Sequence, residues 1–93
     1  MANVIWRAEA LADLDGIADY IEGFDPLAAK RIRAALIDCG ASLSVFPRRG
    51  RPRGGELREM ATVAPYVLSY LVHDQIVEIV ELRHGAKLPR VRP

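Results

Sequence analysis

The feature that most constrains the fold is a largely apolar stretch, residues 66–82, that runs directly into a cluster of cations. Two apolar runs within it, residues 67–72 and 76–82, are separated by three polar residues, 73–75. Apolar side chains at consecutive positions point to both faces of a sheet, which is typical of central strands. The sequence therefore predicts a long β-hairpin inside a sheet, although its turn lacks the Asn-Gly or Asp-Gly of the strongest hairpin signals.

The length and composition indicate one globular domain that spans residues 1–93. An apolar share of 51% is enough to form a core, which excludes wholesale disorder. The single cysteine, Cys39, excludes an internal disulfide and fits a reducing compartment. Because Cys39 lies within a helical pattern of apolar residues, we expect it to be a small core residue. Because the sequence shows neither a signal-peptide pattern nor an apolar run of membrane-spanning length, we expect a cytoplasmic protein without a membrane partner.

Charge is distributed unevenly, although the net charge is only +1. Residues 9–25 carry six acidic side chains and no Lys or Arg, whereas residues 48–53 carry four arginines and no acid. Such asymmetry can favour a polyanionic partner at one end of the fold. A solvated helix face and a solvated loop explain the same pattern, and charge alone favours this simpler interpretation.

Two helices are predicted after a short strand over residues 3–7. Apolar residues recur at helical spacing from residue 9 to Gly23, where the first helix is expected to stop. Asp25 is a suitable N-cap and Pro26 a suitable first residue for a second helix, which we expect to extend to about Ser44. The pair is interpreted as an antiparallel helical hairpin.

After the helices, residues 47–55 have the composition of a loop, and they are the one stretch that looks mobile. Residues 56–62 are predicted to form a strand ahead of the long hairpin, and residues 88–93 an extended basic tail. The order is therefore β-α-α-β-β-β. It predicts an α+β fold in which a two-helix hairpin packs on one face of a mainly antiparallel four-stranded sheet.

The chemistry that the sequence offers is cationic. No histidine or cysteine lies at metal-ligand spacing, and no glycine-rich phosphate motif joins a strand to a helix, so neither a metal nor a cofactor is expected. Arginine can grip phosphate, histidine can move protons, and Glu59 or Glu81 can serve as a base. Such a set can cleave RNA without a metal, or bind a protein or nucleic-acid complex. The cations in question are Arg58, Arg83, His84, Lys87 and the arginines of residues 47–55.

Simpler structural roles account for the same residues. Arg58 and Arg83 can be strand-end charges paired with Glu56, Glu59 or Glu81. His84 can be a turn residue bonded to the backbone. From the inventory alone, these roles are favoured over catalysis.

Five segments, taken in their order and spacing, resemble toxins of the RelE/ParE superfamily from bacterial type II toxin–antitoxin modules. They are WRAEALADLDGIADYI, DPLAAKRI, FPRRGRPRGGELRE, PYVLSYLV and VEIVELRHGAKLPR, which together span nearly the whole chain. The closing RHGA with its following proline, and the pairing of LRE with PYVLSY, look more like the ParE branch.

The resemblance implies a cytoplasmic, plasmid-stabilisation-type toxin whose first strand lies beside its last. It also implies a cognate antitoxin whose C-terminal segment wraps the helix pair and a sheet edge. In the ParE branch the toxin inhibits DNA gyrase, and Arg58, Arg83, His84 and Lys87 would be target-binding residues with no role in bond making.

The RelE branch offers an alternative, a ribosome-dependent mRNA endonuclease. The resemblance would then make Arg58, Glu59, Arg83 and His84 catalytic. This sequence departs from that branch at Val67, where an arginine is common, and in having no aromatic residue after Tyr70. A third alternative is an inactive member that only binds its antitoxin. Whether the target is gyrase or the ribosome stays open from the sequence.

Overall fold

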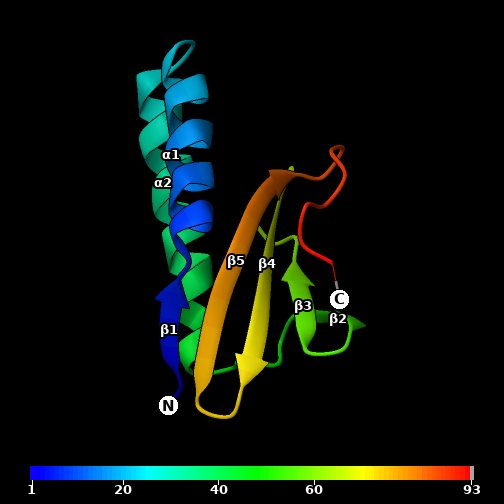
Figure 1. Cartoon of the computed structure of the whole chain (residues 1–93). Coiled ribbons are helices and arrows are strands. Elements are labelled where there is room, and N and C mark those ends of the chain that lie inside the picture. The colour runs from blue at the N-terminus through cyan, green and yellow to red at the C-terminus, as the bar shows by residue number, and fades with distance from the viewer. Residues whose placement is uncertain (93) are drawn as a thin grey trace.

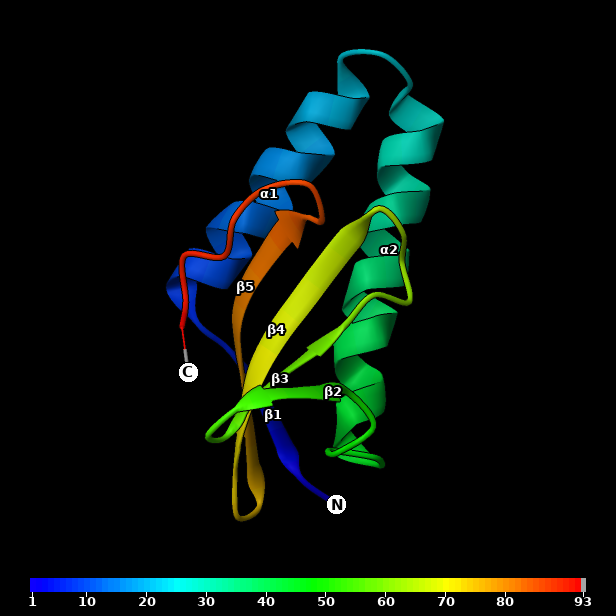
Figure 2. The ribbon, with the colours of Figure 1, turned by 90° about the vertical axis from the view of Figure 1, so that its right-hand side faces the viewer.

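The computed structural model describes residues 1–92, and Pro93, the end of the predicted tail, lies outside the described residues. Figure 1 shows two layers, a hairpin of two long helices beside a twisted sheet. Figure 2, turned by 90°, shows the sheet lying across the helix pair. In chain order the elements are β1 (Asn3–Trp6), α1 (Ala8–Glu22), α2 (Pro26–Ala41), the 3-10 helix η1 (Ser42–Ser44), β2 (Arg51–Gly54), β3 (Leu57–Met60), β4 (Tyr66–His73) and β5 (Ile76–His84).

The sheet contains five strands within residues 1–92, in the order β1-β5-β4-β3-β2. β1 runs parallel to β5, with Val4 opposite Val77, and the other three pairings are antiparallel. The predicted α+β class, the central hairpin and the position of the first strand beside the last are therefore confirmed. The predicted count of four strands is wrong, because it omits β2.

β2 lies within the segment that was predicted to be a loop. Its Arg51 stands opposite Glu59 of β3, and Gly54 and Gly55 supply the left-handed turn between the strands, with φ of 119° and 56°. Proline and glycine disfavour a strand by propensity, but proline is tolerated at a sheet edge, where one side of the strand needs no donor. A long-range partner thus decides the conformation of β2.

The helix boundaries follow the predicted signals closely. The Asp25 carboxylate accepts a hydrogen bond from the Ala28 backbone N–H at 3.1 Å, and Pro26 is the first residue of α2, as predicted. α2 itself ends at Ala41, three residues before the predicted boundary at Ser44. The Ser42 hydroxyl donates to the Cys39 carbonyl at 2.6 Å, and the chain tightens there into η1.

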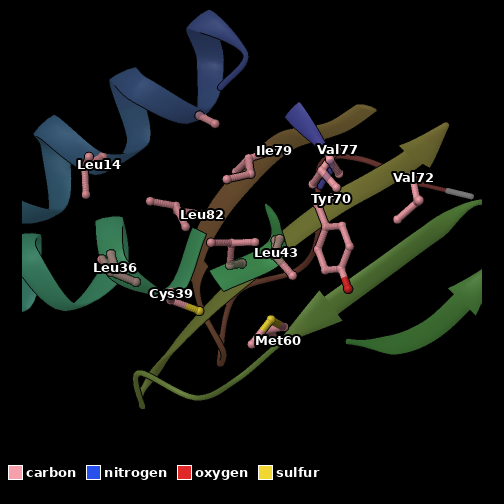
Figure 3. Packing of buried hydrophobic residues seen from close by; sticks show 13 residues of the cluster. Leu14, Leu36, Cys39, Leu43, Met60, Tyr70, Val72, Val77, Ile79 and Leu82 are labelled. Carbon is pink, nitrogen blue, oxygen red and sulfur yellow. The ribbon is translucent and has the colours of Figure 1, made fainter. Parts of the chain in front are cut away.

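The core fills the space between the helix pair and the sheet. Figure 3 shows Leu14 and Leu36 from the helices and Ile79 and Leu82 from β5 in one packed layer. Tyr70 at the centre of β4 is fully buried, and its hydroxyl accepts a hydrogen bond from the Gly50 N–H at 2.8 Å. This bond holds the chain ahead of β2 against the core. The buried residues of this core cluster are Ala2, Ala10, Leu14, Leu36, Cys39, Leu43, Met60, Leu68, Tyr70, Val72, Val77, Ile79 and Leu82.

Cys39 occupies the core as predicted, and its burial raises the pKa of the thiol. The neighbouring Gly40 allows α2 to approach the sheet closely. A Cβ at this position would lie 2.8 Å from both Ile79 Cδ1 and Trp6 Cζ2, well inside van der Waals contact. Both residues therefore serve packing rather than chemistry.

Candidate functional site

The candidate site extends from β2 and β3 across β4 to the end of β5, on the side of the sheet away from the helices. Arg58 stands opposite the core residue Tyr70, whereas Glu59 stands opposite Ser69. Because successive side chains of a strand point to opposite faces, Glu59 points away from the core that contains Tyr70. The same alternation brings Arg51 of β2 opposite Glu59.

The carboxylate of Glu59 is the centre of this site, and Glu59 is only 6% exposed. Its Oε1 accepts a hydrogen bond from Arg51 Nη2, and its Oε2 accepts one from Arg53 Nη1 at 2.6 Å. Arg83 Nη2 lies 3.5 Å from the same Oε2. Burial alone would raise the pKa of Glu59, but the hydrogen bonds and charges of Arg51 and Arg53 outweigh it, so the pKa lies below its ordinary value.

Arg83 reaches this cluster from the end of β5, with its side chain 11% exposed. Its Nε donates to the Lys87 carbonyl at 3.2 Å, which ties the strand to the following turn. Its Nη1 is buried and has no hydrogen-bond partner among residues 1–92. The three arginines and one glutamate carry a net charge of about +2, since arginine stays protonated at any physiological pH.

A hollow of about 400 Å³ opens beside these side chains. Its lining combines charged groups with small apolar ones: Arg51, Glu59, Ala61, Val67, Arg83 and Gly85. The hollow is therefore cationic on balance and accessible from the sheet face.

The turn after β5 carries the remaining predicted residues. The Lys87 N–H donates to the His84 carbonyl at 2.9 Å, and the Gly85 N–H donates to the Pro65 carbonyl at 2.8 Å. His84 Nδ1 accepts a hydrogen bond from the Ala86 N–H at 3.0 Å. This is the backbone-bonded turn role that the sequence offered as the simpler interpretation of His84. The ring of Tyr66 lies edge-on to that of His84, with centroids 5.9 Å apart.

Arg58 does not join this group. Its Nη1 donates to the carbonyls of Arg48 and Gly50 at 3.0 and 2.8 Å, so it fastens the segment that leads into β2. The predicted pairing with a neighbouring glutamate is thus found for Arg83 and is replaced by backbone contacts for Arg58. The structure brings Glu59, Arg83, His84 and Lys87 to one end of the sheet and places Arg58 on the other face.

Comparison with known proteins identifies the family. Residues 4–89 match the family model described as the ParE toxin of the type II toxin–antitoxin system parDE. The chain belongs to the ParE toxin family. It is therefore a toxin of a type II toxin–antitoxin system within the RelE/ParE superfamily, as the resemblance in its sequence indicated, and membership implies an antitoxin partner.

Individual relatives agree with the family assignment. The chain is 49% identical over 88 residues to the toxin RelE2 of Caulobacter vibrioides, covering 95% of this chain and all of that protein. The solved structure of the chromosomal ParDE toxin–antitoxin system from P. aeruginosa matches with a TM-score of 0.78 at 20% identity, over 90% of this chain and 96% of that one. A solution structure of the Helicobacter pylori protein HP0894 matches with a TM-score of 0.55 at 16% identity, over 96% and 100%. The two structural matches support the fold.

The sequence of this ParE-family toxin predicted Arg51 and Arg53 only as members of a basic loop. Their spacing of two residues was the available signal, because side chains at i and i+2 share one face of a strand. That signal required β2 to be recognised as a strand, and its Pro and Gly content argued against this. Both arginines nevertheless contact Glu59, the residue that was predicted to act as a base.

A second charged cluster of the toxin joins β5 to α1 and the tail. Arg90 folds back from the tail, and its Nε lies 3.0 Å from Glu81 Oε2 while its Nη2 binds Asp13 Oδ2. The hydrogen bond to Asp13 is the main reason that the pKa of Arg90 is raised. Asp13 Oδ2 also accepts from the Leu82 N–H at 3.1 Å, so α1, β5 and the tail are joined. This cluster borders a groove of about 790 Å³ between α1, the end of β5 and the tail.

Two features are absent from the part of the chain that the structure describes. Within residues 1–92, no group of three or more His, Cys, Asp or Glu side chains is placed to hold a metal ion. None of the helices in the described part is both long and apolar enough to cross a membrane.

Proposed function

We propose that this toxin inhibits DNA gyrase in the manner of the ParE branch and that a cognate antitoxin neutralises it in the cytoplasm. The observation that carries the proposal is the state of Glu59. A general base needs a pKa near the working pH and a free lone pair. The carboxylate of Glu59 is instead buried among Arg51, Arg53 and Arg83, and its pKa is lowered.

A binding surface explains the strand end better than a reaction centre does. His84 and Lys87 are exposed on the turn after β5, where they can touch a target directly. Arg83 is mostly buried and holds the turn through the Lys87 carbonyl, while Arg58 holds the segment leading into β2. We therefore assign target binding to Arg58, Arg83, His84 and Lys87, the first two by positioning and the last two by contact.

The antitoxin has an apolar surface available to it at the tip of the helical hairpin. Tyr20, Phe24 and Leu27 are 69%, 75% and 62% exposed, and the first two rings pack edge to face. Exposed aromatic and aliphatic side chains gathered in this way favour a protein partner. We expect the antitoxin to cover part of the helix pair, as the family resemblance implies.

A gyrase supercoiling assay with the purified toxin tests the proposal. We expect inhibition with accumulation of linear DNA, relieved by the antitoxin's C-terminal peptide. The double variant Arg83→Ala with His84→Ala should lose at least about tenfold in inhibitory potency, whereas Arg31→Ala on the exposed side of α2 serves as the matched arginine control. Full activity of the double variant would refute the residue assignment.

The RelE-type alternative has a specific observation in its favour. The Nδ1 of His84 accepts the Ala86 N–H, which orients the ring of this exposed side chain and leaves Nε2 as the atom that can contact a substrate. The relative at 49% identity is, moreover, called RelE2. Programmed ribosomes with a defined A-site codon separate the alternatives: mRNA cleavage that is lost in His84→Ala and Glu59→Gln would establish the nuclease. The absence of both gyrase inhibition and mRNA cleavage would favour an inactive member that only binds its antitoxin.

A further inference from the structure

The cluster around Glu59 contains more cationic charge than its carboxylate can neutralise. Glu59 offers two oxygens, and Arg51, Arg53 and Arg83 already share them. One guanidinium nitrogen, Arg83 Nη1, is buried and has no acceptor within the described chain. A buried donor without an acceptor is unfavourable, and a charged one more so, so this position favours a second anion.

The hollow beside the cluster gives such an anion a place to bind. It is bordered by Arg51, Glu59 and Arg83 and has a volume of about 400 Å³. The Arg83 side chain is held in place by its bond to the Lys87 carbonyl, whereas the Arg51 side chain, which binds Glu59, is 74% exposed and can reorient toward a ligand. The site therefore combines one fixed donor with adjustable ones.

The surrounding charges favour an anion with repeating charge. Arg48 and Arg49 are exposed immediately before β2 and add positive charge near this edge of the sheet, although Arg49 Nη1 donates to Ser42 Oγ at 2.9 Å. Glu56, the nearby acid, is engaged by His73. Phosphate matches the two-pronged geometry of a guanidinium, and a nucleic-acid strand presents one phosphate about every 3.4 Å along its axis.

We propose that Arg51, Arg53 and Arg83 form a phosphate-binding site for a nucleic-acid backbone, and that Glu59 occupies the place of an anion in the free toxin. The site deepens the proposed function and rests on it, because a toxin that acts on gyrase meets its target on DNA. Glu59 keeps the three guanidinium groups together before the ligand arrives. It also competes with the ligand, so it lowers the affinity for phosphate.

Direct binding to DNA tests the site without gyrase. Purified toxin is titrated into fluorescently labelled single-stranded and duplex DNA of one length, at several salt concentrations, with anisotropy as the readout. We expect binding that weakens as salt rises, because each neutralised phosphate contributes about 0.9 to the slope of log K against log salt. The double variant Arg51→Ala with Arg53→Ala should bind at least about tenfold more weakly, with a slope lower by about 2.

Two further variants make the test specific. Glu59→Gln removes the competing charge and should tighten DNA binding several-fold. Arg31→Ala, which removes the same charge from α2, should leave both affinity and slope within about twofold of native, since it lies outside the site. The unfolding temperature of every variant is measured in parallel, and Arg51→Gln, a milder change at an exposed side chain, replaces the double variant if the latter does not fold.

Several outcomes would overturn the proposal. One is the absence of DNA binding by the native toxin at low salt, and another is native-like binding by a folded Arg51→Ala, Arg53→Ala variant. A third is displacement of DNA by a polyglutamate peptide of equal charge at equal concentration, which would indicate an acidic protein partner. Gyrase inhibition by a toxin that fails to bind DNA would refute the phosphate site alone, whereas DNA binding without gyrase inhibition would support it and refute the proposed target.

Discussion

Two glutamates, Glu59 and Glu81, are both nearly inaccessible to solvent, with 6% and 1% of their surface exposed. Both lie in strands and both bind arginine, yet the balance of charge around them is opposite. Glu59 is shared by three arginines, and one arginine nitrogen has no partner in the described chain. Glu81 binds a single arginine, Arg90, and there it is a carboxylate oxygen, Oε1, that has no partner in residues 1–92.

This contrast distinguishes the proposed binding site at Glu59 from the structural contact at Glu81. An excess of cations around a buried acid leaves a donor for a further anion, and it makes each single arginine dispensable for stability. A lone arginine that joins Glu81 to Asp13 instead connects the tail, β5 and α1, and nothing else in the described chain neutralises Glu81 if it is lost. Redundancy of charge is thus the basis of the proposed binding site at Glu59, whereas the contacts of Glu81 and Arg90 connect parts of the fold.

The largest expected effect is that of Arg90→Ala. It leaves the carboxylate of Glu81 buried without a cation, and we expect the free energy of unfolding to fall by about 2–3 kcal/mol, below the full cost of a buried unpaired charge because Arg90 is 61% exposed. Urea denaturation at pH 7 measures the change. A loss below about 0.5 kcal/mol would remove the distinction between the two clusters.

Glu59→Gln is expected to have the next largest effect, about 1–2 kcal/mol at pH 7, because three guanidinium groups lose their charged acceptor. The pKa of Glu59 is lowered in the folded protein, so its stabilisation is complete above the ordinary value of 4.5 and is lost as pH falls through the folded value. Urea denaturation at a series of pH values checks this. The curves for native and variant proteins should converge in acid, and a constant separation would contradict the linkage.

Arg90→Lys should have an intermediate effect, a loss of about 1 kcal/mol. The guanidinium holds Glu81 with Nε and Asp13 with Nη2, whereas a lysine has one ammonium group to share between them. Denaturation beside Arg90→Ala ranks the two variants. Equal losses would mean that the fork geometry, and not the charge alone, carries the whole contact.

The smallest effect is expected for Arg51→Ala, a loss of less than about 0.5 kcal/mol. Glu59 keeps Arg53 and Arg83, and the Arg51 side chain is 74% exposed, so solvent already screens its contact. Since Arg51 and Arg90 have similar exposure, the pair forms a matched comparison that differs mainly in redundancy. If Arg51→Ala lowered the free energy of unfolding as much as Arg90→Ala, the interpretation that Glu59 has more arginine partners than it needs would be contradicted.

Local signals in the sequence predicted several parts of this structure correctly. The apolar hairpin, the Asp25–Pro26 helix start and the burial of Cys39 all follow from periodicity, capping and composition over a few residues. Candidate residues at the end of β5 were also predicted, because Arg83, His84 and Lys87 follow an evident strand. These features depend on neighbours in the chain, which the sequence displays directly.

The sequence by itself determined the order of elements, the α+β class and the family, because periodicity and motif order are properties of the linear chain. Only the tertiary structure decided that Arg51 and Arg53 lie on an edge strand and bind Glu59, and that Arg58 lies on the other face of the sheet. It also decided that the tail is held against β5 and α1 by Arg90. Arg90 and Asp13 are 77 positions apart, so no local pattern can pair them. Such contacts arise when packing brings distant charges into a partly dry environment, where burial penalises every charge that remains unpaired.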